Sequence, residues 1–116
     1  MLKYNFENKT VLITASSKGI GFALAKQLAL SGAKVSMNSR SANNLKKAKN
    51  DILSLKKNAK IFTIKQNLED TKNLKNIIIK TEKFFKSKID ILINNSGGPD
   101  PKLIMDTTNK DWEKAL

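Results

Sequence analysis

The chain has 116 residues, enough for one modest domain, and its 22 cationic and 10 acidic side chains give a formal net charge of +12. It contains no cysteine and no histidine, which excludes disulfides, thiolate metal sites and any histidine-based acid, base or nucleophile pair within this chain. Its apolar runs are far shorter than the ~18 residues of a membrane span, and residues 1–8 lack the apolar core of a signal peptide. We therefore expect a soluble, cytoplasmic protein with no membrane partner and no metal site.

The positive charge has the form of a residue bias that runs through the whole sequence. Lysine provides 21 of the 22 cationic residues, and the chain also holds 13 asparagines and 12 isoleucines. Segments that bind nucleic acids interleave basic residues with aromatic platforms or carry a recognition helix, and the sequence has neither pattern. We therefore predict no nucleic-acid partner. A basic nucleic-acid binder, whose affinity would fall steeply with salt, is the alternative.

The first predicted elements are a strand at residues 10–14 and an Ala/Leu-rich helix at residues 19–31. Gly32 is expected to end this helix. A second strand is predicted at residues 33–38. The apolar stripe that the first helix is expected to turn inward consists of Ile20, Leu24 and Leu28.

The second helix is expected to follow Ser41, whose hydroxyl suits an N-cap. Its expected inner face consists of Leu45, Ala48, Ile52 and Leu55. A third strand is predicted at residues 60–65, and Asp70 or Thr71 opens a third helix. The inward residues of that helix are expected to be Leu74, Ile77, Ile78, Phe84 and Phe85.

The fourth predicted strand, residues 89–93, is a near-continuous apolar run, which is typical of a parallel strand covered on both faces. Beyond Pro99 and Pro101 we expect an irregular segment to Thr107 or Thr108, followed by the start of a helix. Strands that alternate with helices in this way predict the α/β class. We expect right-handed crossovers and a Rossmann-type doubly wound parallel sheet with the strand order 3-2-1-4.

The junction between the first strand and the first helix carries the most informative residues. A strand that stops at a tight turn before a helix leaves backbone N–H groups unpaired at the positive end of the helix dipole, where a pyrophosphate binds readily. The turn reads Thr14-Ala15-Ser16-Ser17-Lys18-Gly19-Ile20-Gly21, and its two glycines allow a close approach of ligand and backbone. For this segment taken alone, a closely packed turn without a ligand is the alternative.

The turn resembles the T-G-x-x-x-G-I-G turn of the short-chain dehydrogenase/reductase family, with Ala15 in the place of the first glycine. This difference requires a backbone that tolerates a Cβ, and a positive φ at Ala15 would weaken the match. At the end of the fourth strand, Asn94-Asn95-Ser96-Gly97 is similar to the family's N-N-A-G. An Asn/Gly turn without a function is the alternative for that tetrapeptide in isolation. The resemblance covers nearly the whole chain.

The end of the second strand bears on the choice of cofactor. An acidic residue there would bond the ribose 2′-OH of NAD, and the chain has Ser39-Arg40-Ser41 instead. The planar guanidinium of Arg40 suits a bidentate contact with phosphate. NADP-preferring members of the resembled family also carry a basic residue before the second motif glycine, and that residue is Lys18 here. The two cations indicate NADP (NADPH); a solvated turn lysine and a surface helix-cap arginine are the alternatives.

The resemblance implies further contacts with the cofactor. Asn67 and Leu68 match the pair that holds the adenine edge, with a plain turn asparagine as the alternative. Asn95 and Gly97 would border the nicotinamide ribose. The complete set of predicted cofactor-binding residues is Thr14, Ser16, Ser17, Lys18, Gly19, Ile20, Gly21, Arg40, Asn67, Leu68, Asn95 and Gly97.

The catalytic residues of the resembled family, a serine and a Tyr-x-x-x-Lys pair, follow the part that this chain matches. The single tyrosine, Tyr4, is followed four residues later by Asn8 and not by a lysine. Trp112 and Leu116 resemble the start of the helix after the fourth strand. We therefore predict no catalytic residue in the chain. Residues 1–116 are interpreted as the NADP-binding Rossmann half of a short-chain dehydrogenase/reductase, truncated within that helix and inactive by itself.

For the full-length protein, the resemblance implies an NADP-dependent oxidoreductase that transfers hydride between carbonyl and alcohol groups of a small-molecule substrate, as a homo-oligomeric dimer or tetramer. The chain looks most like the members that act as 3-oxoacyl-acyl-carrier-protein reductases. A non-catalytic dinucleotide-binding or interaction module is the alternative. A reading frame that continues past Leu116 into a serine and Tyr-x-x-x-Lys favours the enzyme, whereas a stop codon there favours the module.

Overall fold

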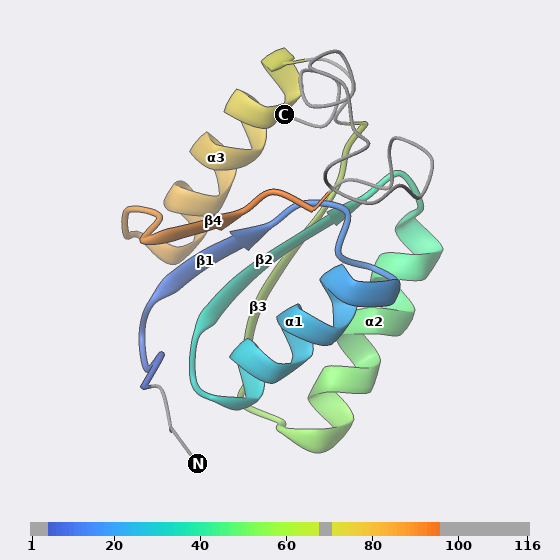
Figure 1. Cartoon of the computed structure of the whole chain (residues 1–116), viewed down its shortest axis with the longest axis vertical. Helices are drawn as coiled ribbons and strands as arrows, with labels where there is room; N and C mark the ends of the chain where they lie inside the picture. The colour runs from blue at the N-terminus through green and yellow to red at the C-terminus, as the bar shows by residue number, and fades with distance from the viewer. Residues whose placement is uncertain (1–4, 68–70, 96–116) are drawn as a thin grey trace, which may run out of the picture.

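Strands and helices alternate along the chain in the computed structural model, which describes residues 5–67 and 71–95 (Figure 1). The elements are β1 (Thr10–Ile13), α1 (Gly19–Leu30), β2 (Lys34–Ser39), α2 (Ala42–Leu55), β3 (Lys60–Lys65), α3 (Thr71–Phe85) and β4 (Ile91–Ile93). The strands and helices predicted before residue 95 are therefore confirmed, with small shifts at their ends. No helix of this part of the chain is both long enough and apolar enough to cross a membrane. The segment and helix predicted after Pro99 lie outside the described residues.

The strands form one parallel sheet in the order β3-β2-β1-β4, as predicted. Val11 of β1 pairs with Val35 of β2 on one side and with Ile91 of β4 on the other. The chain moves in one direction from β1 to β3 and then returns across the sheet to β4. If every crossover has the same hand, this reversal sends the last helix to the opposite face. Figure 1 shows this arrangement, with α1 and α2 on one face and α3 on the other.

The core lies between the two central strands and helices α1 and α2. The strand residues that are fully buried in this cluster are Val11, Ile13, Val35 and Met37. Successive side chains of a strand point to opposite faces, and the residue between two of these, Ser36, shares a 2.7 Å hydrogen bond with Thr81 of α3. Both faces of β2 are therefore covered by helices.

Helix α1 packs on the sheet through small residues. Its buried residues are Gly21, Ala25, Leu28 and Ala29. Leu28 is inside as predicted, but Ile20 and Leu24 are 75% and 37% exposed, so the prediction that they face inward is wrong. A glycine and two alanines let the helix lie close to the strands, and this face is buried in preference to the bulkier one because close approach fills space better. Gly32 ends the helix with a φ of +94°, as predicted.

Helix α2 begins as the sequence predicts. The Oγ atom of Ser41 accepts a 3.1 Å hydrogen bond from the backbone N–H of Asn44, which confirms Ser41 as the N-cap. The predicted inner residues that are buried are Leu45, Ala48 and Ile52. Leu55 is 58% exposed, and the prediction for this residue is wrong because α2 ends there and the chain turns away toward β3.

Helix α3 and strand β4 are less enclosed than the sequence predicts. Ile77 is fully buried, but Phe84 is 55% exposed, with its ring stacked on Phe62 of β3 at a centroid separation of 4.7 Å. The predicted inner residues that are half-buried are Leu74, Ile78 and Phe85. Leu92 in the middle of β4 is 47% exposed. The prediction of a strand covered on both faces is wrong for the described part of the chain, because Ile91 and Ile93 pack against the core on one face while Leu92, on the other face, is only partly covered.

Candidate functional site

The turn between β1 and α1 lies at the carboxyl edge of the parallel sheet. Two of its residues have a left-handed backbone, with φ of +49° at Ala15 and +62° at Gly19. Glycine adopts this conformation without steric cost, but a residue with a Cβ pays ~1–2 kcal/mol. Since φ at Ala15 is positive, the match between this turn and a turn with glycine at that position is weakened there, as expected from the sequence for this case. Contacts elsewhere must hold this backbone in place.

Asn38 of β2 clamps the turn with its side chain and its backbone. Its Oδ1 accepts a 3.0 Å hydrogen bond from the N–H of Ala15, and its Nδ2 donates to the carbonyl of Ile13 at 3.1 Å. Its carbonyl accepts from the N–H of Ser16 at 3.0 Å, and its N–H donates to the Ser16 Oγ at 3.2 Å. Asn38 is 1% exposed and Ser16 is fully buried. Water is therefore kept from the Asn38 side of these hydrogen bonds.

The residues after β4 hold the same turn from the other side. The Oγ1 of Thr14 donates to the carbonyl of Asn95 at 2.6 Å, and the N–H of Thr14 donates to the carbonyl of Ile93 at 3.1 Å. The Nδ2 of Asn95 donates to the carbonyl of Ala15 at 3.1 Å. The N–H of Ala15 is thus bonded to Asn38 and its carbonyl to Asn95. The ends of β2, β1 and β4 meet at this one residue.

Gly21 allows α1 to begin directly against the turn. A Cβ at Gly21 would lie 2.5 Å from the carbonyl oxygen of Ala15 and 2.6 Å from the Nδ2 of Asn95. A Cβ at Gly19 would meet no atom within 4 Å. Gly21 is therefore needed for close packing, whereas Gly19 borders open space at the start of the helix.

The amino end of α1 presents backbone donors to that open space. Lys18 occupies the N-cap position with an extended backbone, no side chain caps the helix, and its first turn has no acidic residue. The first N–H groups of a helix have no partner within the helix, and the helix dipole favours negative charge there. An uncapped helix end beside a glycine fits a phosphate group of a dinucleotide.

A contact between two hydroxyl groups joins this turn to the end of β2. The Oγ of Ser17 donates to the Oγ of Ser39 at 2.9 Å, and the Ser39 Oγ also accepts from the N–H of Ser41 at 3.1 Å. The next residues along the two segments are Lys18 and Arg40, both exposed. Within residues 5–67 and 71–95, neither cation forms an ion pair. Two cations on adjoining turns favour an anion between them.

The remaining predicted residues follow the ends of the same strands. Asn67 is exposed two residues after β3, and its carbonyl accepts a hydrogen bond from the Nδ2 of Asn73. The side chain of Ile20 is exposed. Leu68 and Gly97 lie outside the described residues. One edge of the sheet therefore collects the described members of the set, which are Thr14, Ser16, Ser17, Lys18, Gly19, Ile20, Gly21, Arg40, Asn67 and Asn95.

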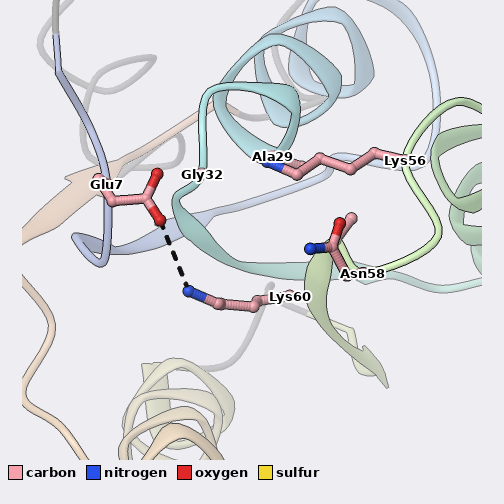
Figure 2. Close-up of a pocket in the computed structure, with 7 residues that line it drawn as sticks. Glu7, Ala29, Gly32, Lys56, Asn58 and Lys60 are labelled. Carbon is pink, nitrogen blue, oxygen red and sulfur yellow. Dashed lines mark ion pairs between the residues drawn. The ribbon is translucent and has the colours of Figure 1, made fainter.

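A hollow lies at the opposite edge of the sheet, where α1 and α2 end (Figure 2). The residues that line it are Glu7, Ala29, Gly32, Lys56, Asn58, Ala59 and Lys60. Lys60 pairs with Glu7 at 3.9 Å and donates to the Oδ1 of Asn8 at 2.7 Å. Lys56 donates to the carbonyl of Leu30 at 3.5 Å. The cations of this hollow already have partners within the protein.

Comparison with known proteins agrees with the fold. Residues 9–116 match the family described as short chain dehydrogenase. The chain belongs to the short-chain dehydrogenase/reductase family. It is 31% identical over 118 residues to Tropinone reductase-like 3 of Erythroxylum coca, which covers 97% of this chain and 45% of that relative. It is 34% identical over 112 residues to the 3-oxoacyl-(acyl-carrier-protein) reductase of Escherichia coli, which covers 97% of this chain and 43% of that relative.

Solved structures of the family share the fold of the chain. A variant short-chain dehydrogenase/reductase from Serratia marcescens has a TM-score of 0.77 at 24% identity, over 97% of this chain and 45% of that one. L-Sorbose reductase from Gluconobacter frateurii, solved with NADPH and L-sorbose, has a TM-score of 0.75 at 24% identity, over 94% of this chain and 41% of that one. The chain thus spans less than half the length of these relatives, and it is homologous to their amino-terminal, NAD(P)-binding portion.

The sequence pattern of the short-chain dehydrogenases/reductases identified the turn but not the residue that clamps it. Asn38 follows Met37 in a strand whose four central residues are buried, and an asparagine at such a position is the one feature of the sequence that could have indicated its role. A carboxamide in such a place must find hydrogen-bond partners. The periodicity of a strand does not indicate that the partners lie in a turn more than twenty residues earlier in the sequence.

Proposed function

We propose that the natural protein containing this chain is an NADPH-dependent oxidoreductase that acts on the carbonyl or alcohol group of a small molecule. Residues 1–116 would form its dinucleotide-binding half. The observation that carries the proposal is the 2.9 Å contact between Ser17 and Ser39, which joins the turns bearing Lys18 and Arg40 at the edge where α1 begins uncapped. A helix end and two neighbouring cations suit a ligand with a pyrophosphate and a further phosphate.

The parts of NADPH have matching groups in the chain. We assign the pyrophosphate to the backbone of the turn that ends at Gly21, with Thr14, Ser16, Ser17, Gly19 and Ile20 shaping it. The 2′-phosphate is assigned to Lys18 and Arg40, since β2 ends in Ser39 and has no carboxylate that would repel it. Family resemblance assigns the adenine to Asn67 and Leu68, and the nicotinamide ribose to Asn95 and Gly97.

The names of relatives support a reductase that uses NADPH. The Escherichia coli relative is a 3-oxoacyl-(acyl-carrier-protein) reductase. A solved NADPH-dependent reductase involved in bacilysin biosynthesis is 28% identical to the chain with a TM-score of 0.75, and it covers 92% of this chain and 45% of that one. We propose the same cofactor and a similar carbonyl reduction here. A cytoplasmic location and a dimeric or tetrameric assembly remain predictions from the sequence and the resemblance.

A bound nicotinamide would supply the hydride chemistry, and the residues of this chain would bind and orient it. The proton would come from the Tyr-x-x-x-Lys pair expected elsewhere in the natural protein. The natural coding sequence after the codon for Leu116 tests this part directly. A frame that continues into a serine and Tyr-x-x-x-Lys is the expected result, and a stop codon would leave the dinucleotide-binding module instead.

Direct titration of the intact natural protein tests the cofactor. We expect NADPH to bind at least about tenfold more tightly than NADH, because the 2′-phosphate gains charge-assisted hydrogen bonds from two cations. Equal affinities for the two dinucleotides would remove the assignment of Lys18 and Arg40. Binding of neither dinucleotide would overturn the proposed function.

A further inference from the structure

Ala15 has a backbone conformation that its own side chain disfavours. Its φ is +49°, in the left-handed region that glycine adopts readily and in which a Cβ is sterically crowded. A residue stays in such a conformation when the surrounding structure fixes it. The N–H of Ala15 donates a hydrogen bond to the Oδ1 of Asn38 at 3.0 Å. Asn38 lies in β2, which follows the turn in the sequence and is separated from it by α1. The compensation is therefore tertiary and not local.

We propose that Asn38 is a positioning residue for dinucleotide binding. Its buried carboxamide holds Ala15 in the conformation that a glycine would adopt unaided, and so aims the N–H groups at the amino end of α1 toward the pyrophosphate. This inference rests on the proposed dinucleotide site. It adds a residue that makes no contact with the ligand and that acts through the turn.

The carboxamide matches its two partners at once. Oδ1 accepts from the N–H of Ala15, and Nδ2 donates to the carbonyl of Ile13 at 3.1 Å, so the side chain spans the residues on either side of Thr14. A leucine of similar size makes neither hydrogen bond. A serine has one hydroxyl and is too short to reach both partners. The 1% exposure of Asn38 keeps water from replacing the lost bonds.

The backbone of Asn38 fixes the direction of its side chain. The carbonyl of Asn38 accepts from the N–H of Ser16 at 3.0 Å, and the N–H of Asn38 donates to the Ser16 Oγ at 3.2 Å. The Ser16 Oγ also donates to the carbonyl of Ile13 at 2.8 Å. Removing the carboxamide leaves this backbone pairing intact. The expected result is a turn that stays attached to β2 but no longer favours the left-handed conformation at Ala15.

The effect should depend on which phosphate a ligand carries. The segment from Ala15 runs directly into the amino end of α1, where the pyrophosphate is assigned. Arg40 belongs to a different segment, in which Ser39 and Ser41 also form contacts at the start of α2. Adenosine 2′-monophosphate has the phosphate assigned to Lys18 and Arg40 but no pyrophosphate. Since Arg40 lies outside the turn that Asn38 holds, the affinity for this ligand should be much less sensitive to Asn38 than the affinity for NADPH.

The test is a double-mutant cycle on the intact natural protein with Asn38→Leu, Ala15→Gly and both together. The dissociation constants of NADPH and of adenosine 2′-monophosphate are measured for each variant, together with the urea midpoint of unfolding. Ser36→Ala is the matched control, because Ser36 is a fully buried polar residue of the same strand whose partner, Thr81, lies in α3, away from the turn. Asn38→Ser is the second variant in case Asn38→Leu does not fold.

We expect Asn38→Leu to raise the NADPH dissociation constant about tenfold, the size of one or two buried hydrogen bonds, and about threefold or less when Ala15→Gly is also present. Asn38→Ser should give a smaller rise, about threefold, that Ala15→Gly also removes. Adenosine 2′-monophosphate should change by less than about twofold, and Ser36→Ala should lower the urea midpoint with NADPH binding unchanged.

Three results would overturn the inference. The first is that Asn38→Leu or Asn38→Ser changes the NADPH dissociation constant equally with and without Ala15→Gly. The second is that these variants weaken the binding of NADPH and of adenosine 2′-monophosphate equally, and the third is that Ser36→Ala loses NADPH affinity in proportion to its loss of stability. A wild-type protein that binds no NADPH would instead refute the proposed function, and the inference would fall with it. A wild-type protein that binds NADPH while the cycle shows no coupling refutes the inference alone.

Discussion

The two edges of the sheet are built from similar materials and differ in how they treat charge. Each edge has a glycine packed against another segment, Gly21 at the carboxyl edge and Gly32 at the amino edge, and each has exposed lysines. At the amino edge, Lys60 is paired with Glu7 at 3.9 Å (Figure 2). At the carboxyl edge, Lys18 and Arg40 have no ion-pair partner among the described residues. Lys60 of the amino edge thus has an ion-pair partner within the protein, whereas the charges of Lys18 and Arg40 at the carboxyl edge are left for a ligand.

The two edges also differ in what lies beneath the surface. The carboxyl edge contains a polar network anchored on the buried Asn38, in which the N–H and the carbonyl of Ala15 are each bonded to an asparagine side chain. The polar contacts around the hollow of the amino edge include exposed ones, such as that between Lys60 and the Oδ1 of Asn8. Buried, fully bonded polar groups hold one geometry, whereas exposed ones exchange with water. The comparison teaches that fixed geometry combined with unpaired charge, rather than positive charge alone, distinguishes a binding site in this lysine-rich chain.

The largest effect is expected from adding a side chain at the glycine of each edge. Gly21→Val places a Cβ only 2.5 Å from the carbonyl oxygen of Ala15 and 2.6 Å from the Nδ2 of Asn95. We expect it to lower the free energy of unfolding by about 3 kcal/mol, at the upper end of the cost of overpacking. We also expect it to abolish NADPH binding. Urea unfolding and fluorescence titration of the intact natural protein measure both effects.

Gly32→Val is the matched variant at the amino edge. A Cβ there meets the carboxylate of Glu7, an exposed side chain that is able to move, although the φ of +94° adds strain. We expect a stability loss of roughly 1–3 kcal/mol with the NADPH dissociation constant unchanged below the unfolding transition. Loss of binding in both variants in proportion to stability would erase the distinction between the two edges.

The next effect concerns charge. Arg40→Asp combined with Lys18→Ala removes both unpaired cations of the carboxyl edge, and we expect it to weaken NADPH about 100-fold and NADH less than about threefold. The matched control with the same change in net charge is Lys57→Asp combined with Lys60→Ala at the amino edge. It should change neither affinity by more than about twofold at 0.15 M salt, because exposed charges more than a Debye length away are screened. Equal losses for the two dinucleotides would contradict the assignment of the 2′-phosphate.

The order and type of the elements followed from the sequence because they depend on local patterns. Apolar runs, the N-cap at Ser41 and the helix-ending Gly32 each act within a few residues, and the structure confirms them. The direction in which a helix faces depends on what it packs against. Ile20 and Leu24 form a regular stripe, yet the glycine and alanine face of α1 is buried because it fits the sheet more closely. Amphipathic spacing alone does not predict which of these two faces of α1 is buried.

The sequence predicted which residues form the candidate site, but it did not predict which contacts hold the turn in place. The glycines, Lys18 and Arg40 stood out as a motif and as an unusual residue type, and the structure brings their segments together through Ser17 and Ser39. The left-handed backbone of Ala15 and its contact with Asn38 depend on two segments that meet only in the folded chain. The conformational propensity of a single residue does not indicate which distant residue will contact it. The asparagine in a buried strand was the one local sign of it.

A smaller effect is expected at the N-cap that follows Arg40. Ser41→Ala removes the hydrogen bond from the N–H of Asn44 to the Ser41 Oγ at 3.1 Å, and we expect it to lower the free energy of unfolding by about 1 kcal/mol. Ser54→Ala is the control in the same helix, because the exposed Ser54 hydroxyl bonds only to the local carbonyl of Asp51. It should change stability by less than about 0.5 kcal/mol. Equal effects in urea unfolding would show that Ser41 does not anchor the helix that begins beside the site.

The smallest effect is expected at the ion pair of the amino edge. The side chains of Lys60 and Glu7 are 43% and 57% exposed and 3.9 Å apart, so Glu7→Gln should lower the free energy of unfolding by less than about 0.5 kcal/mol. Added salt should remove even this difference, because exposed charges are screened. A loss above about 1 kcal/mol that persists in 0.5 M salt would mean that the pair is held as rigidly as the network around Ala15. The contrast between a fixed carboxyl edge and a solvated amino edge would then have to be abandoned, since geometry would no longer separate the two.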